Sequence, residues 1–512
     1  MRRVWKRSMV GSAMLVAALL PSAGTLHAQT PAAATVAIPR VTGPIAVTAD
    51  SYPSMAAATL QDPIDLRARG YVEEEFFVSG AANVYDWALD NSLTVKTPNA
   101  PYTTRILVRR PADPARFSGN VIVEMGNNAR RYDWAFTWSL SYDHFIDRGD
   151  AWVLLTYVPA AVDSLKQFNA ARYAPLSFAN PTPNAPCAPD RPASAAEEGL
   201  RWDMISQVGA LLRSAAPSTP LAGFRVERVY ATSHGGELPT YITAVHPRAK
   251  LAGGRAVFDG FIVHRYAGLG RINQCAAAPA ANDPRQITKN AGVPVIRIVA
   301  QTDVLGTYQR RRPDSDERGD AYRLYEVAGA PHADGYFYRH MPALKDQTAM
   351  GTAPFLAFWP FAEHCTPEIP LMEFPVMRYV VNAAFANLDR WVREGTPAPR
   401  AERIAVKNAG TPMAAIDTDE FGNAKGGVRS PYLDVPTATY AATTPGPGTC
   451  GNLGHKNAFT WERLEATYGG FAKFAARFDE AVDRLVRERW LTESDGRRIK
   501  ATPRSTTLSA AR

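Results

Sequence analysis

One segment, residues 224–245, constrains the fold of this chain more than any other. Residues 224–230 form an apolar run typical of a buried strand, and Ala231-Thr232-Ser233-His234-Gly235-Gly236 follows at once. Residues 238–245 then have the composition of a helix. A serine between a strand and a helix, with small neighbours, is typical of a sharp turn that presents the hydroxyl above a sheet edge. The segment therefore predicts a nucleophilic serine at position 233.

The same residues also fit a plain Ser-Gly-Gly turn, so the motif by itself leaves both interpretations open. Ala231 stands where the usual G-x-S-x-G pattern has its first glycine, and alanine is small enough to keep strand and helix close. Pro239 falls in the first helical turn, where its missing N–H costs little. Catalysis requires partner residues further along the chain.

The rest of the chain predicts an α/β fold. About eight runs have strand-like composition, and helical segments separate most of the later ones. This alternation favours a mostly parallel, eight-stranded sheet flanked by helices. The runs are residues 71–78, 103–108, 119–124, 150–158, 224–230, 256–260, 293–303 and 322–332.

The residue types needed for nucleophilic catalysis follow such runs. Ser233, Asp303 and His332 each stand directly after the strand-like part of a run. The carboxyl ends of parallel strands meet at one edge of a sheet, so we expect these side chains to gather there. A serine hydroxyl needs a base to take its proton, and a carboxylate behind the base fixes the correct imidazole tautomer. The order Ser–Asp–His is also that of one large class of serine hydrolases.

The assignments have alternatives. His332 is also compatible with a surface loop, and Asp259 ends the run before that of Asp303, so Asp259 is the alternative acid. The oxyanion of an acyl-transfer intermediate needs two preorganised donors. The N–H of His234, directly after the serine, is one candidate, and the segment Gly126-Asn127 after the third run supplies the other.

The first residues have the pattern of an export signal. Basic residues at positions 2–7 precede an apolar run, and Leu26-His27-Ala28 has the form of a signal-peptide cleavage site. We expect residues 1–28 to be a signal peptide and the mature chain to begin near Gln29. The protein is then secreted or periplasmic, and the sequence leaves the Sec or Tat route open.

Charge argues against a nucleic-acid partner. The formal net charge is +8, and it falls to +4 without residues 1–28 because that segment holds four basic residues and no acidic one. The densest remaining basic run, 310–312, precedes Asp314, Asp316 and Glu317, so it predicts a solvated loop. No later stretch is long and apolar enough for a membrane helix. The expected partner is a small-molecule ester.

Residues 29–512 are expected to form one domain, with insertions at 159–197 and 261–292 and a C-terminal extension from about residue 335. The chain has four cysteines without a metal-binding spacing, which in an oxidising compartment suggests two disulfides with three possible pairings. We predict Cys187–Cys275, which would tie the two insertions into a cap, and Cys365–Cys450. No H-E-x-x-H or C-x-x-C motif occurs, so the chemistry requires no metal or cofactor.

Several motifs, taken together, are shared with one known family. They are 70–75 (GYVEEE), 102–111 (YTTRILVRRP), 121–124 (VIVE), 233–236 (SHGG), 326–329 (EVAG), 332–334 (HAD), 422–423 (GN) and 426–429 (GGVR). Over this range the chain resembles the large secreted bacterial alpha/beta hydrolase domain proteins. The resemblance implies an α/β-hydrolase fold with catalytic roles for Ser233 and His332. Family members often carry Glu-Thr-Asp at positions 301–303, which implies Asp303 as the acid.

These observations favour a serine hydrolase that cleaves carboxylic esters through an acyl-enzyme intermediate. A peptidase or amidase on the same triad, and a non-catalytic binding protein of this fold, remain the alternatives. Aromatic residues follow both the proposed oxyanion segment and His332, and they fit either a pocket for an apolar or aromatic ester or ordinary core packing. They are Tyr132, Trp134, Phe136, Trp138, Tyr336, Phe337 and Tyr338.

Overall fold

The computed structural model describes residues 35–235, 237–265, 268–355, 365 and 376–502. The predicted signal peptide, residues 1–28, lies outside the described residues. Within the described part of the chain, no helix has the length and apolar character needed to cross a membrane.

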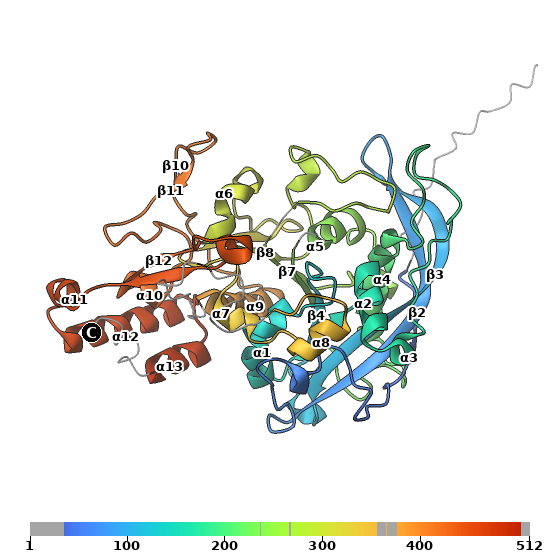
Figure 1. The fold of residues 1–512 in the computed structure, drawn as a ribbon, viewed down its shortest axis with the longest axis horizontal. Helices are drawn as coiled ribbons and strands as arrows, with labels where there is room; N and C mark the ends of the chain where they lie inside the picture. The colour runs from blue at the N-terminus through green and yellow to red at the C-terminus, as the bar shows by residue number, and fades with distance from the viewer. Residues whose placement is uncertain (1–34, 236, 266–267, 356–364, 366–375, 503–512) are drawn as a thin grey trace, which may run out of the picture.

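A nine-stranded sheet forms the centre of the molecule, in the order β1-β2-β3-β5-β4-β6-β7-β8-β9 (Figure 1). The strands from β5 to β9 are parallel, whereas β3 is antiparallel to both of its neighbours. The predicted mostly parallel sheet is therefore confirmed, with one extra short edge strand, β1. The bounds are β1 Arg40–Thr42, β2 Tyr71–Trp87, β3 Leu93–Pro111, β4 Asn120–Met125, β5 Ala151–Leu155, β6 Arg228–His234, β7 Gly260–His264, β8 Val295–Ala300 and β9 Tyr322–Val327.

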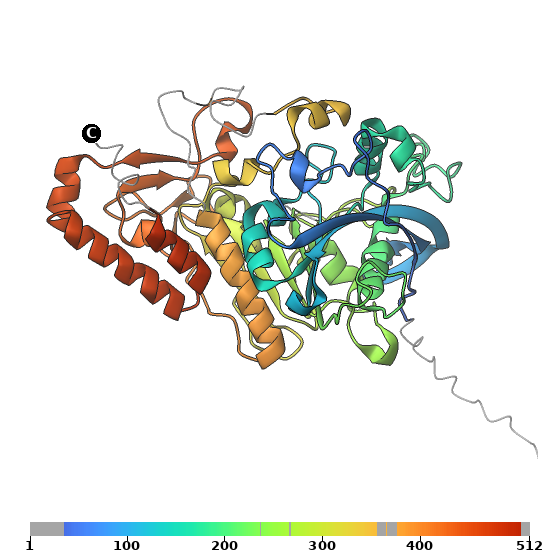
Figure 2. The ribbon, with the colours of Figure 1, turned by 90° about the horizontal axis from the view of Figure 1, so that it is seen from below.

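Helices flank the sheet because the parallel strands are buried on both faces and need apolar cover. The helices α1 (Phe136–Arg148) and α9 (Val376–Glu394) lie side by side, α1 against β6 and α9 against β7 to β9 (Figure 2). The helix α4 (Arg201–Arg213) packs against β2 and β6. Helix α9 approaches the sheet so closely that a Cβ on Gly260 would lie 2.8 Å from Leu388 Cδ1.

Further helices occupy the connections and the C-terminal region. They are α2 Pro159–Phe168, α3 Ala170–Tyr173, α5 Glu237–Thr240, α6 Val304–Thr307, α7 Gly335–Tyr338, α8 Leu344–Ala349, α10 Pro431–Asp434, α11 Trp461–Tyr468, α12 Phe471–Arg487 and α13 Glu493–Ala501. Two small sheets pair β10 (Val406–Lys407) with β11 (Ala415–Ile416) and β12 (Ala438–Ala441) with β13 (His455–Ala458). The last helices lie at one end of the molecule (Figure 2).

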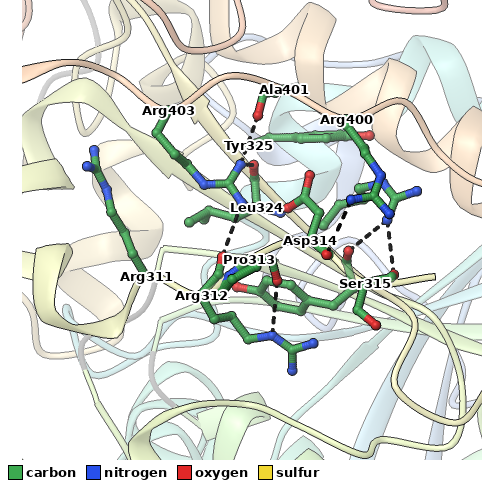
Figure 3. A network of polar contacts seen from close by, with 12 residues as sticks. Arg311, Arg312, Pro313, Asp314, Ser315, Leu324, Tyr325, Arg400, Ala401 and Arg403 are labelled. Carbon is green, nitrogen blue, oxygen red and sulfur yellow. Dashed lines mark hydrogen bonds and ion pairs between the residues drawn. The ribbon is translucent and has the colours of Figure 1, made fainter. Parts of the chain in front are cut away.

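The prediction of a solvated basic loop at residues 310–312 is wrong. Arg312 is buried and forms an ion pair with Asp320, and Arg311 binds both carboxylate oxygens of Glu326 at 2.7 Å. The acids that follow the run are used by other arginines: Asp314 pairs with Arg403 of the C-terminal extension (Figure 3). Charged residues that the sequence suggests are solvated therefore attach the C-terminal extension to β9, the last strand of the sheet.

Two strands are displaced from their predicted positions. The strand predicted at residues 224–230 runs over Arg228–His234. The strand predicted at residues 256–260 runs over Gly260–His264, in register with Tyr230–His234 of β6. The second insertion consequently begins after His264 rather than at residue 261. Asp259 precedes β7, so it lies at the amino ends of the parallel strands, whereas Asp303 and His332 lie at their carboxyl ends.

Both predicted disulfides, Cys187–Cys275 and Cys365–Cys450, are present. The first joins the two insertions, where Arg191 and Ser194 also hydrogen-bond to residues 274 and 275. The joined insertions pack on the β2–β3 hairpin, since Asn273 Nδ2 donates to the Tyr85 carbonyl at 2.7 Å.

We expect loss of the Cys187–Cys275 bond to lower the free energy of unfolding. The bond spans 88 residues, and the chain-entropy model assigns a loop of this size about 4.6 kcal/mol. Urea unfolding of the Cys187→Ser/Cys275→Ser double variant, followed by circular dichroism, measures the effect, with oxidised wild type as control. An unchanged unfolding midpoint would contradict a stabilising role.

Candidate active site

Asp303 and His332 meet at the carboxyl ends of the adjacent strands β8 and β9. The His332 Nδ1 lies 2.9 Å from Asp303 Oδ2 and 3.2 Å from Oδ1. The backbone N–H of His332 also donates to Thr302 Oγ1 at 3.1 Å, which positions the loop. Parallel strands in register deliver both residues to one edge, as the sequence predicts. The pair can hold a neutral imidazole with its second nitrogen free to accept a proton.

Electrostatics favour the charged carboxylate at this position. Burial by itself would raise the pKa of Asp303, but the hydrogen bond from His332 and the charges of His332 and Arg265 outweigh it. The pKa of Asp303 therefore lies below its ordinary value. Arg265 Nε stands 3.5 Å from Asp303 Oδ1, so a second cation contributes to this balance. An ionised Asp303 can stabilise an imidazolium on His332.

Ser233 lies on β6, two strands away from β8, and is 2% exposed. Its Oγ has no hydrogen-bond partner among the described residues, so it does not hydrogen-bond to His332 in this structure. The predicted sharp turn also comes later than Ser233: β6 continues through His234, and the left-handed turn is at Gly235, with φ 129°. Glycine tolerates this conformation because it has no Cβ.

Two histidine rings lie at the site without having been predicted there, since His234 was expected to contribute only its backbone N–H and His264 was not considered. The His234 ring stacks on Phe136 at 4.0 Å and lies 5.2 Å from the His332 ring. His264, the last residue of β7, stands edge-on to His234 at 4.6 Å. Burial lowers the pKa of both rings, and the interactions with His332 and the Arg265 guanidinium lower it further. A correct boundary for β7 would have revealed His264 from the sequence.

The segment proposed for the oxyanion site is held tightly by hydrogen bonds. The Asn127 N–H donates to the Trp134 carbonyl at 2.8 Å, so this backbone donor is already used. The Asn127 side chain donates from Nδ2 to the His234 carbonyl at 2.8 Å, which connects the segment to the end of β6. A Cβ on Gly126 would lie 2.9 Å from Asp133 Cβ, so only glycine fits there.

Asp259, the alternative acid, lies at the other end of the parallel strands from the Asp303–His332 pair. Its carboxylate forms ion pairs with Arg213 and Arg255 and accepts the Val229 N–H at 2.8 Å. Val229 lies near the start of β6, whereas Ser233 and His234 lie at its end. Asp259 therefore has a structural role at the opposite edge of the sheet.

A cavity of about 520 Å³ opens beside the Asp303–His332 pair. His234 and His332 line it, whereas Ser233 is not among its lining residues. Of the seven aromatic residues considered from the sequence, Trp134, Phe136, Phe337 and Tyr338 line the cavity. The other three pack elsewhere: Tyr132 and Trp138 are buried, and Tyr336 hydrogen-bonds to Arg378.

The walls of the cavity come from unexpected parts of the chain. Residues 351–353 and 449–452 contribute, and Cys450 in the second segment carries the disulfide to Cys365. Within the described residues, Arg265 is the only contribution from either predicted insertion. The C-terminal extension therefore shapes the cavity. No group of three or more His, Cys, Asp or Glu suited to a metal ion occurs in the described residues.

Buried histidines predict that acid destabilises the protein. Burial lowers the pKa of four of them to about 3, against an ordinary value near 6.5: His144, His246, His264 and His340. The native state stays neutral at these sites while the unfolded chain takes up protons below pH 6.5. Each of these histidines lowers the free energy of unfolding by on the order of 1 kcal/mol per pH unit as pH falls from about 6.5 to 3.

Five buried carboxyls act in the opposite direction. Burial raises the pKa of Glu124 and of Asp334 to about 7, and it also raises the pKa of Asp133, Asp150 and Asp203, so these groups weaken the fold as pH rises. Burial lowers the pKa of His234 and His455 as well, so six such histidines outnumber the five carboxyls, and we expect the thermal midpoint to fall between pH 6.5 and 4.5 and more steeply below. His246→Phe should reduce this pH dependence, since both His246 nitrogens lack partners among the described residues and Phe258 and Phe261 surround the ring. A thermal midpoint that is constant from pH 7 to 4 would contradict the prediction.

Comparison with known proteins identifies the fold family. The family model described as "Alpha/beta hydrolase domain" matches residues 41–501. Comparison with curated proteins finds no match.

Solved structures with similarity to the chain include several esterases. Esterase Est22 is 12% identical, with 57% of this chain and 82% of that chain covered and a TM-score of 0.31. Fungal esterases from Rhizomucor miehei are represented at 14% identity, with 65% and 92% covered and a TM-score of 0.32. Esterase 2 of Thermogutta terrifontis, phosphorylated by paraoxon, is 12% identical, with 48% and 82% covered and a TM-score of 0.26.

Proposed function

The chain belongs to the alpha/beta hydrolase domain family, and we propose that it is a serine hydrolase that cleaves carboxylic esters. The observation that carries the proposal is the Asp303–His332 hydrogen bond of 2.9 Å at the edge of a cavity. This pair is the base and orienting acid that a serine nucleophile requires. Ser233, at the end of β6 on the same sheet edge, is the proposed nucleophile.

The proposed reaction proceeds through an acyl-enzyme. The Ser233 Oγ attacks the ester carbonyl while its proton passes to His332 Nε2, and ionised Asp303 stabilises the resulting imidazolium. Backbone donors at His234 and Gly126 hold the oxyanion. Collapse expels the alcohol, which takes the proton from His332, and water then attacks the acyl-enzyme with His332 again acting as base.

Catalysis by Ser233 requires a rearrangement at the end of β6. The Ser233 hydroxyl must reach His332, with which it forms no hydrogen bond here. Catalytic hydrogen bonds in proteins without substrate are often long and tighten only when substrate binds. Gly235 supplies a hinge. Its φ is 129°, and glycine can change φ over a wide range at little cost because it has no Cβ.

The cavity and the disulfides support two further parts of the proposal. Four aromatic residues on the cavity wall suit an ester with an apolar or aromatic group. Two disulfides are typical of proteins in an oxidising compartment, which agrees with export to the periplasm or medium.

Labelling with a fluorophosphonate tests the proposal, because only an activated serine reacts quickly. We expect wild type to be labelled and peptide mapping to place the label on Ser233. The Ser430→Ala variant is a matched control, since the Ser430 hydroxyl is also buried and has no hydrogen-bond partner in the described part of the chain. A panel of aryl esters and the corresponding anilides then separates an esterase from a peptidase or amidase. Unlabelled, folded wild type would reject the proposal.

A non-catalytic binding protein is the second candidate function. The observation in its favour is that His234, and not Ser233, faces His332 across the cavity. On this alternative, aromatic ligands bind in the cavity, while wild type neither reacts with the fluorophosphonate nor turns over any ester.

A further inference from the structure

The cavity beside Asp303 and His332 has a basic wall. Arg130, Arg131 and Arg265 line it, and neither Asp nor Glu is among its lining residues in the described chain. Arg265 is already engaged with Asp303 at 3.5 Å. By contrast, Arg130 and Arg131 form no ion pair and no side-chain hydrogen bond with the described residues. Two guanidinium groups are therefore available at the cavity, and the described part of its wall holds no acid that would balance them.

The loop that carries these arginines is held in a defined shape. Trp134 and Asn127 exchange two backbone hydrogen bonds, and the Arg131 N–H donates to the Asn128 carbonyl at 2.8 Å. Asn128 Nδ2 donates to Asp133 Oδ1 at 3.1 Å across the loop. Arg131 has a φ of 68°, a left-handed conformation that is unfavourable for a side chain with a Cβ. Such strain is often found where the backbone presents a functional side chain.

Arg130 is further positioned by an aromatic ring. Its guanidinium lies over Phe355, 4.2 Å from the ring centroid. Stacking occupies the face of the planar guanidinium and leaves the N–H groups at its edges free to donate. A guanidinium held in this way suits bidentate binding of a carboxylate.

We propose that Arg130 and Arg131 bind a carboxylate of the substrate. The natural substrates are then anionic esters, which carry a carboxylate in the same molecule as an apolar or aromatic group. The aromatic group packs on Trp134, Phe136 and Phe337, which line the same cavity. The substrate class rests on the proposed hydrolase function, but carboxylate binding itself can be measured without turnover.

Direct binding is the first test. Isothermal titration of wild type with 4-butylbenzoate and with the isosteric, neutral 4-butylbenzamide measures the preference for the charged group. We expect the carboxylate to bind about 10- to 100-fold more tightly, as charge-assisted hydrogen bonds typically provide. Arg130→Gln/Arg131→Gln should remove this preference and leave binding of the amide within about twofold. Arg225→Gln/Arg497→Gln, which removes two exposed arginines outside the cavity lining, is the charge-matched control.

Kinetics provide the second test. The substrates are the butanoyl esters of 4-hydroxybenzoate and of 4-hydroxybenzamide, and each variant is compared with wild type on both. We expect the double variant to lose about 10- to 100-fold in kcat/KM on the anionic ester, mainly through KM, with little change on the neutral ester. Raising the salt concentration should reduce the preference of wild type and have no such effect on the double variant.

The outcomes separate this proposal from the proposed function. Preferential carboxylate binding that depends on Arg130 and Arg131, without hydrolysis of any ester, would support the anion site and reject the hydrolase. Hydrolysis without preference for the anionic ester, together with equal binding of benzoate and benzamide, would overturn the anion site. An equal loss of binding for both ligands in the double variant would also overturn it, because the arginines would then only maintain the cavity.

Discussion

Ser233→Ala should abolish ester hydrolysis, with a loss of about 10⁵- to 10⁶-fold in kcat, as found when a catalytic serine is removed from a serine protease. The Oγ is the proposed attacking atom, and alanine retains the backbone and the packing at the end of β6. The variant should remain folded, because the hydroxyl is buried without a hydrogen-bond partner. Circular dichroism and steady-state assays on one aryl ester measure both properties.

Two controls make the result specific. Ser430→Ala removes another buried, unpartnered hydroxyl in the C-terminal extension and should retain full activity. His234→Gln retains the backbone N–H proposed for the oxyanion and removes the ring that faces His332. Activity that survives in Ser233→Ala and disappears in His234→Gln would contradict Ser233 as nucleophile and transfer the chemistry to the histidine.

Asp303→Asn should lower turnover by about 10⁴-fold while the fold is retained. The carboxylate accepts a hydrogen bond from His332 Nδ1 at 2.9 Å, whereas an amide can instead donate its N–H and favour the wrong imidazole tautomer. The loss should appear mainly in kcat, because Asp303 is not among the residues that line the cavity. Assays of kcat and KM on the same ester provide the measurement.

Asp259→Asn is the matched control for this acid. It weakens ion pairs with Arg213 and Arg255 at the other edge of the sheet, so we expect near-normal turnover and a loss of about 2 kcal/mol in unfolding free energy. Near-normal turnover in folded Asp303→Asn, with collapse of activity in Asp259→Asn, would refute the assignment.

The sequence alone was sufficient for the features that depend on local pattern. Buried parallel strands appear as apolar runs, so their presence and their sequence along the chain can be predicted. This is why the meeting of Asp303 and His332 could be expected. The pairing of the cysteines was proposed from the positions of the two insertions, and the structure agrees.

Only the tertiary structure decided the features that depend on register and on distant contacts. Pairing with β6 and β8 places β7 at Gly260–His264, four residues later than its apolar pattern suggested, which brings His264 to the site and moves Asp259 away. The use of the Asn127 N–H by Trp134 and the contribution of residues 449–452 to the cavity likewise arise from contacts between separate segments. Hydrophobic periodicity specifies which residues are buried, but hydrogen bonding between strands sets where each strand begins and which groups face one another.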